Sequence, residues 1–232
     1  MAIHQPNFLP WLGYFDKIRR SDVFVMMDNA QFSKTGGTWT NRVQMMVNME
    51  PAWVTVPIVR AYHGLRTIRE MRINDSQPWR AKLLRTIELN YGRAPHFTEV
   101  APLVRELIEQ PTTDLAEYNL TAIRTICGEL QLTTPIVVGS SLATVGRSTD
   151  MLIAMVKAVE GTAYLAGGGA SGYQDDEKFK QHAVELVYQD FQHPRYRHFN
   201  ADGFTPGLSI VDALMNCGFD GVRSLLGTTS SD

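Results

Sequence analysis

Polar side chains gather in the turn that follows the first predicted strand. His4 ends an apolar-biased segment at residues 2–4, and Gln5 and Asn7 lie between this segment and a helix predicted over 10–20. The spacing of polar residues in an ordinary helix or strand does not explain three polar side chains at these positions. Parallel α/β folds bind ligands at the carboxyl ends of strands and the amino ends of helices, so the cluster predicts a binding site. Each residue taken singly has an equally good structural interpretation. Asn7 could cap the helix, and His4 and Gln5 could form hydrogen bonds with backbone groups of the loop.

The second predicted strand ends in a similar way. Asp28 ends the apolar run 22–28, which is typical of a buried parallel strand, and Gln31 comes shortly after it. If the first two strands are neighbours, Asp28 lies beside the first turn, where it could act as a base or hold an amine or hydroxyl. The alternative is an ordinary turn built by an Asp-Asn pair.

Further candidates follow the later strands. An arginine after a glycine loop suits a phosphate or carboxylate, although a surface ion pair is an equal alternative. Glycines after a strand let a ligand approach backbone N–H groups. Polar loops after several strands indicate a small-molecule cleft at one edge of the sheet. The predicted substrate-binding residues are Gln5, Asn7, Gln31, Asn41, Arg42, Ser140, Gly167, Gly168 and Tyr173.

His193 is the histidine best suited to act as a general base. Pro194 keeps it outside any helix, and an imidazole titrates near neutral pH. The predicted catalytic residues are therefore His193, Asp28 and His4, with a structural histidine as the alternative. No metal is expected, because the histidines lack metal-ligand spacing. Cys127 lies in an apolar helical stripe and Cys217 ends a helix, so neither is expected to be a nucleophile.

Composition narrows the classes of function. The chain has 232 residues, a formal net charge of −2 and 44% apolar residues, as expected for a globular protein with a full core. It has no basic tract typical of nucleic-acid binding and no apolar run long enough to span a bilayer. No signal peptide is apparent and only two cysteines occur, which predicts a cytoplasmic location. A small molecule is the expected partner, and nothing indicates a particular cofactor or oligomeric state.

Strand and helix patterns alternate along most of the chain. Three consecutive helices over 77–92, 97–110 and 114–131 interrupt that alternation. We therefore expect an α/β fold, a three-layer Rossmann-like parallel sheet, formed by residues 1–76 and 132–232. Residues 77–131 are expected to form a helical insert or lid subdomain. Near the start of the chain, residues 53–59 read as a strand whose proline marks an edge or an end.

The opening segment, His-Gln-Pro-Asn-Phe-Leu-Pro-Trp-Leu-Gly-Tyr-Phe at residues 4–15, also carries a resemblance. Together with Asp-Asn-Ala-Gln-Phe at 28–32, His-Pro-Arg-Tyr at 193–196 and Asn-Cys-Gly at 216–218, it resembles the WbqC-like family. Genes of that bacterial family tend to lie in O-antigen and other glycan clusters. The resemblance spans nearly the whole chain and implies a role in surface-glycan (O-antigen, lipopolysaccharide) or specialised-metabolite biosynthesis.

A second resemblance concerns architecture. The strand, loop and helix at the amino terminus are similar to those of HxGH nucleotidylyltransferases such as pantothenate synthetase. Trp11 and Tyr14 stand where that motif has its two histidines. Since neither residue carries a positive charge, efficient adenylyl transfer from ATP is not expected.

These observations support three hypotheses of function. The first is a transferase that attaches an acyl or aminoacyl group to the amine of an amino-sugar or similar molecule, with an activated donor. A charged tRNA as that donor is left open, although nucleic acid is otherwise not expected. The second is an ATP-using ligase or nucleotidylyltransferase descendant. The third is a non-catalytic binding or assembly protein with a nucleotide-like pocket.

Overall fold

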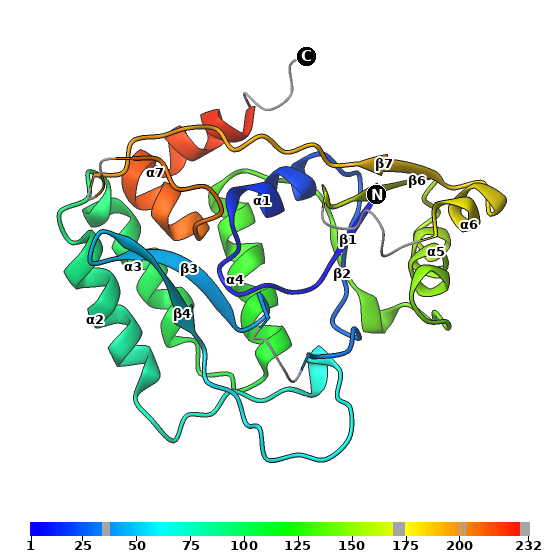
Figure 1. Cartoon of the computed structure of the whole chain (residues 1–232), viewed down its shortest axis with the longest axis horizontal. Helices are drawn as coiled ribbons and strands as arrows, with labels where there is room; N and C mark the ends of the chain where they lie inside the picture. Colours follow the sequence, from blue (N-terminus) through cyan, green and yellow to red (C-terminus); the bar gives the residue numbers. More distant parts are fainter. Residues whose placement is uncertain (34–37, 169–174, 200, 202, 228–232) are drawn as a thin grey trace.

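The computed structural model describes residues 1–33, 38–168, 175–199, 201 and 203–227. A five-stranded, all-parallel sheet lies at its centre (Figure 1). The strand order is β5-β2-β1-β6-β7, with the bounds Ile136–Val138, Phe24–Met26, Ala2–His4, Ala163–Ala166 and Glu185–Tyr188. The protein is α/β, as predicted, with helices flanking the sheet in a Rossmann-like three-layer arrangement.

Helices cover both faces of this sheet (Figure 1). The α-helices are α1 (Leu12–Arg19), α2 (Trp79–Tyr91), α3 (Phe97–Glu109), α4 (Leu115–Glu129), α5 (Thr149–Ala158), α6 (Asp176–Gln181) and α7 (Ile210–Gly227). Two 3₁₀ turns, η1 (Ile68–Glu70) and η2 (Gly139–Ser141), complete the described helices.

Side chains that point alternately to the two faces of the sheet form two separate hydrophobic cores. Ala2 and Phe24 face one way and join a core with residues of α1, α4 and α7. Ile3 and Val25 face the other way and pack against residues of α5 and α6. Successive side chains of a strand point to opposite faces, so the apolar runs read from the sequence must be covered on both sides.

The three consecutive helices are α2, α3 and α4, close to their predicted bounds. Their buried side chains, among them Leu83, Val104 and Ile123, belong to the same core as α1 and α7. Whether residues 77–131 behave as a separate subdomain stays a prediction.

The break in α7 follows from one glycine. Gly218 has φ 67°, and a Cβ placed there would lie 2.5 Å from His96 Nδ1. A side chain is therefore excluded both by the backbone conformation and by the close approach of the imidazole.

A separate antiparallel hairpin precedes the helices. It consists of β3 (Arg42–Val47) and β4 (Glu50–Thr55). The strand predicted over 53–59 corresponds to the second half of β4, whereas β3 was not predicted. Figure 1 shows the hairpin beside α2, on the side of the molecule away from α5 and α6.

Candidate functional site

A cavity of about 210 Å³ lies at the carboxyl ends of β1 and β6. The chain proceeds from β1 outward through β2 and β5, then returns to the other side of β1 with β6 and β7. The β1/β6 boundary is therefore the topological switch point, where open α/β sheets bind ligands. This switch-point cavity is lined by His4, Trp11, Gly13, Tyr14, Lys17, Gly167, Gly168, Gln189 and Phe191.

The amino end of α1 forms one wall. Trp11 precedes the helix, and no side chain caps the first turn. The indole of Trp11 lies across Gly13, where a Cβ would come within 2.2 Å of the ring. Gln189 fixes this turn from the other side, since its Nε2 donates to Gly13 O at 2.8 Å and to Asp16 Oδ2 at 2.9 Å. Glycine at position 13 is thus required by packing.

Lys17 is the charged side chain of the cavity. It is 2% exposed, and its Nζ donates to Ile3 O at 2.9 Å. The amine lies 5.7 Å from the centre of the Tyr164 ring, and a Cβ at Gly167 would lie 3.9 Å from it. Among the described residues, no carboxylate forms an ion pair with Nζ. Burial lowers the Lys17 pKa to about 7, so the amine can exchange a proton near neutral pH.

His4 lies at the end of β1 in the same cavity. Its Nδ1 is 3.2 Å from Gln5 O, which assigns the proton to Nδ1 and leaves Nε2 as an acceptor. Burial, with a smaller contribution from the charge of Lys17, lowers the His4 pKa to about 3. The imidazole is therefore neutral at pH 7 and offers a hydrogen-bond acceptor.

Tyr14 separates this cavity from a second one. Its hydroxyl lies 2.9 Å from Gln5 O and 3.1 Å from Met26 Sδ. Burial raises the Tyr14 pKa well above its ordinary value, so the hydroxyl stays protonated. Tyr14 lines the first cavity and Met26 lines the second, so this contact joins a wall of one cavity to a wall of the other.

The second cavity, of about 290 Å³, lies at the carboxyl ends of β2 and β5. Asp28 Oδ1 accepts from the Ser140 N–H at 2.8 Å, and Oδ2 accepts from Ser140 Oγ at 2.7 Å. Arg72 also lines it and pairs with Asp114 at 2.8 Å. Both carboxylate oxygens of Asp28 are thus engaged in joining the loop after β2 to the loop after β5. The lining residues are Met26, Asp28, Arg69, Arg72, Asp114, Ala116, Glu117, Leu120, Val138 and Ser140.

Comparison with known proteins shows which family the chain belongs to. The family model described as "WbqC-like protein family" matches residues 5–224. This chain belongs to the WbqC-like family. It is also 30% identical over 221 residues to a Mycobacterium tuberculosis (strain ATCC 25618 / H37Rv) protein named "Uncharacterized protein Rv1507c", covering 94% of both chains. No solved structure matches it. The resemblance read from the opening motif is confirmed.

The sequence-predicted site residues of this WbqC-like protein fall in several places. His4, Gly167 and Gly168 line the switch-point cavity, and Asp28 and Ser140 line the second cavity. The expectation of one shared cleft is therefore replaced by two adjoining cavities, because β1 separates the loop after β2 from the loop after β6.

His193 contacts two walls of the switch-point cavity without lining it. Its ring lies 5.0 Å from those of both Trp11 and Phe191, measured between ring centres. Partial burial lowers the His193 pKa. The imidazole supports the Trp11 side chain, and its catalytic role stays a prediction.

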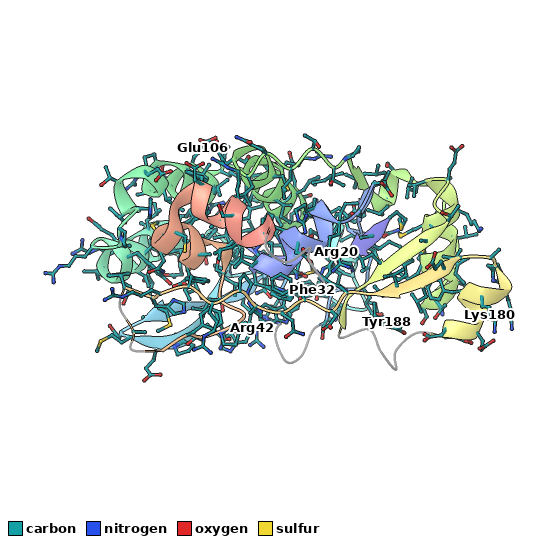
Figure 2. The ribbon with its side chains drawn as sticks, turned by 90° about the horizontal axis from the view of Figure 1, so that it is seen from above. Arg20, Phe32, Arg42, Glu106, Lys180 and Tyr188 are labelled. Carbon is teal, nitrogen blue, oxygen red and sulfur yellow. The ribbon has the colours of Figure 1, made fainter. Side chains whose placement is uncertain are left out.

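The remaining predicted residues that the structure describes lie outside both sets of lining residues. Asn7 is buried, and Gln31 pairs in an isolated bridge with Thr67. Asn41 Nδ2 donates to Val56 O at 3.0 Å. Arg42 stacks over Trp53 in the hairpin, and Figure 2 shows it well apart from Tyr188 at the end of β7. Gln5 supplies its carbonyl to His4 and Tyr14, and Tyr173 lies outside the described residues.

The sequence prediction missed Lys17. One indication was available: Asp16 and Lys17 interrupt a short helix whose neighbours Tyr14, Phe15 and Ile18 are all apolar or aromatic. A lysine within such a segment is unusual, because lysine is rarely fully buried without a partner.

Two findings concern metals and membranes. Among the described residues, no three His, Cys, Asp or Glu side chains are grouped closely enough to hold a metal ion. Within the same ranges, no helix has the length and apolar character needed to cross a membrane.

Proposed function

We propose that this WbqC-like protein transfers an acyl or aminoacyl group to the amine of a sugar or other small molecule, at the switch-point cavity. The observation that carries the proposal is the buried Lys17 amine beside Gly167, with a pKa near 7. The role fits a pathway that builds a surface glycan or a specialised metabolite, as the family resemblance implies.

The chemistry of amide formation explains why such a lysine is useful. The acceptor amine attacks the carbonyl carbon, a C–N bond forms, and the bond to the donor's leaving group breaks. The nitrogen loses a proton in the process, and a general base with a pKa near the working pH takes it most effectively. Neutral Lys17 can take that proton, and its protonated form can donate to the leaving group.

Neighbouring groups suit the same reaction. The neutral His4 imidazole can accept a hydrogen bond from the attacking amine through Nε2. Gly167 lacks a side chain, so a ligand can approach the backbone after β6. Backbone donors aimed at a developing negative oxygen contribute strongly in such sites.

Lys17 is a better candidate base than the two residues favoured by the sequence. Asp28 lies in the other cavity with both oxygens bonded to Ser140. His193 packs against Trp11 and Phe191 outside the lining. Both remain alternatives that substitution can test.

The cavity sizes suggest how a larger substrate would be held. The switch-point cavity is smaller than the roughly 300–1,000 Å³ of a typical ligand pocket. It suits the reacting amine and acyl group, while the adjoining cavity at Asp28 suits a more distant part of the donor or acceptor.

An ATP-using ligase or nucleotidylyltransferase descendant is the second candidate. The position of the cavity at the topological switch point, beside the uncapped first turn of α1, favours it. Trp11 and Tyr14 line the cavity where the HxGH enzymes have histidines, and they supply no positive charge to phosphate. A non-catalytic binding protein with this pocket is the third candidate.

A mass-spectrometric screen for products, combined with thermal melting, distinguishes the three functions. Purified protein is incubated with acyl-CoA thioesters, carboxylic acids plus ATP, or charged tRNA as donors, and with nucleotide-linked amino-sugars as acceptors. Lys17→Met is the matched control. Lys17-dependent acylation of an acceptor supports the proposal. Formation of AMP and pyrophosphate supports the second candidate, and ligand-induced stabilisation without turnover supports the third.

A further inference from the structure

The backbone register of the β3–β4 hairpin determines which of its groups face outward. Asn48 and Met49 have φ of 52° and 66°, as in a two-residue hairpin turn. The Val56 N–H donates to Asn41 O at 2.8 Å, and Arg42 is opposite Thr55. Hydrogen-bonded pairs alternate in an antiparallel ladder. The N–H and C=O groups of Thr55, and of Trp53 two residues earlier, therefore face away from β3.

The corresponding edge of β3 is covered by the rest of the protein. The Met46 N–H donates to the Tyr91 hydroxyl at 2.9 Å. The Gln44 carbonyl accepts from the Ser209 N–H at 2.8 Å. Tyr91 of α2 and Ser209, the residue just before α7, thus complete hydrogen bonds on that side.

None of the described residues covers the outer edge of β4 in this way. Within the described ranges, no hydrogen bond engages the outward N–H or C=O of Trp53 or Thr55. Pro57 ends this edge, where its carbonyl accepts from the Asn74 N–H at 2.9 Å. Pro51 has no N–H to offer at the other end. The open edge is therefore short, with two donors spaced two residues apart.

A cavity of about 660 Å³ runs along this edge, between β4 and the start of α2. It is larger than either cavity of the parallel sheet. Apolar side chains form most of its walls, and Lys82 is the charged residue among those that line it. The lining residues are Val47, Ala52, Trp53, Val54, Thr55, Pro57, Gln77, Pro78, Trp79, Lys82, Leu83 and Thr86.

We propose that this β4 groove binds a short, extended, acidic peptide segment of another protein. The segment adds one strand to the outer edge of β4, with backbone hydrogen bonds to Trp53 and Thr55. Alternate side chains of an added strand point to the same face and can fill pockets such as the one at Leu83. A carboxylate of the peptide pairs with Lys82, since none of the described residues that line the groove is acidic.

Charge distinguishes this partner from a second copy of the chain. Pairing two β4 edges would bring two Lys82 side chains to the same interface without a carboxylate from either groove. Like charges at an interface are unfavourable, whereas an acidic peptide supplies the complementary charge.

The test compares the wild type with Thr55→Pro. Because the Thr55 N–H faces away from β3, this substitution removes an outward donor and leaves the hairpin ladder intact. A display library of random heptapeptides is selected on both full-length proteins in parallel. We expect acidic sequences with alternating apolar residues to be enriched on the wild type only. Their affinity should fall by about tenfold or more in Thr55→Pro and in Lys82→Glu, and stay near wild type in Thr55→Ala.

Hydrogen exchange provides a readout specific to strand addition. A bound peptide should slow exchange of the Trp53 and Thr55 amides, which are open in the free protein, and leave the Ala52 and Val54 amides of the ladder unchanged. If Thr55→Pro is poorly folded, the wild-type protein is tested instead with a selected peptide whose backbone nitrogens are methylated. This peptide should not bind. Three results would each overturn the proposal. They are equal enrichment of peptides on both proteins, binding without protection of the Trp53 and Thr55 amides, and a wild-type dimer that Thr55→Pro abolishes.

Discussion

The Lys17 Nζ donates a 2.9 Å hydrogen bond to the carbonyl of Ile3, a residue of the strand that leads into its own helix. This bond holds the amine near Gly167, the residue that follows β6 much later in the chain. Among the described residues, this is the hydrogen bond that the structure gives the ammonium, and Lys17 lines the switch-point cavity.

Lys17→Met should lower acyl-transfer turnover by roughly 10²–10⁴, because it removes a general base while keeping a side chain of similar length. The melting temperature should stay the same or rise, since the substitution removes a buried, unpaired charge. Turnover and thermal melting are measured on the same preparation. Unchanged turnover in a folded variant would remove Lys17 from the mechanism.

His193→Ala distinguishes the two candidate bases. If Lys17 takes the proton, His193 acts only by packing on Trp11, and turnover should fall by less than about tenfold. If His193 is the base, the loss should be roughly 10²–10⁴ with a nearly unchanged melting temperature. Trp11→Phe is the control for lost packing alone.

The Lys17 amine should also make stability depend on pH. Its pKa falls from 10.5 in the unfolded chain to about 7 in the folded protein. Between these values the unfolded state binds more protons, so the free energy of unfolding should rise as pH increases from about 7 towards 10. Urea melts across this range measure the rise, and it should be smaller in Lys17→Met. Equal slopes for the two proteins would contradict a buried amine.

His4 should also make the free energy of unfolding rise with pH, but over a lower pH range. Its pKa falls from 6.5 to about 3 on folding, so the folded protein loses stability as pH decreases from 6.5 towards 3. His4→Gln cannot take up that proton and should show a weaker loss of stability in acid. Denaturant melts at pH 4 and pH 7 provide the comparison, with His63→Gln as the control at an exposed histidine.

Asp28→Asn tests whether that carboxylate is catalytic or structural. The amide keeps one acceptor but loses the charge that receives two bonds from Ser140. A structural role predicts a loss of about 1–3 kcal/mol in the free energy of unfolding with activity kept in the folded protein. Ser140→Ala should then cost stability in the same way. Loss of turnover without loss of stability would instead favour a catalytic Asp28.

The sequence by itself determined the class of fold and the family. Short-range periodicity is enough to recognise a buried strand at 22–28 or a helix over 77–92, since side-chain burial follows the local repeat. The same pattern placed His4, Asp28, Ser140 and Gly167 after strands. It missed β3, because the turn at Asn48 and Met49 lacks the glycine that usually indicates a hairpin.

Only the tertiary structure decided which of these loops meet. The position of β1 between β2 and β6 puts His4 with Gly167 and leaves Asp28 with Ser140. The lowered pKa of Lys17 has the same origin, because its burial requires Ile3 and Tyr164 from two different strands. Strand order and burial depend on contacts between distant parts of the chain, and no local pattern encodes them.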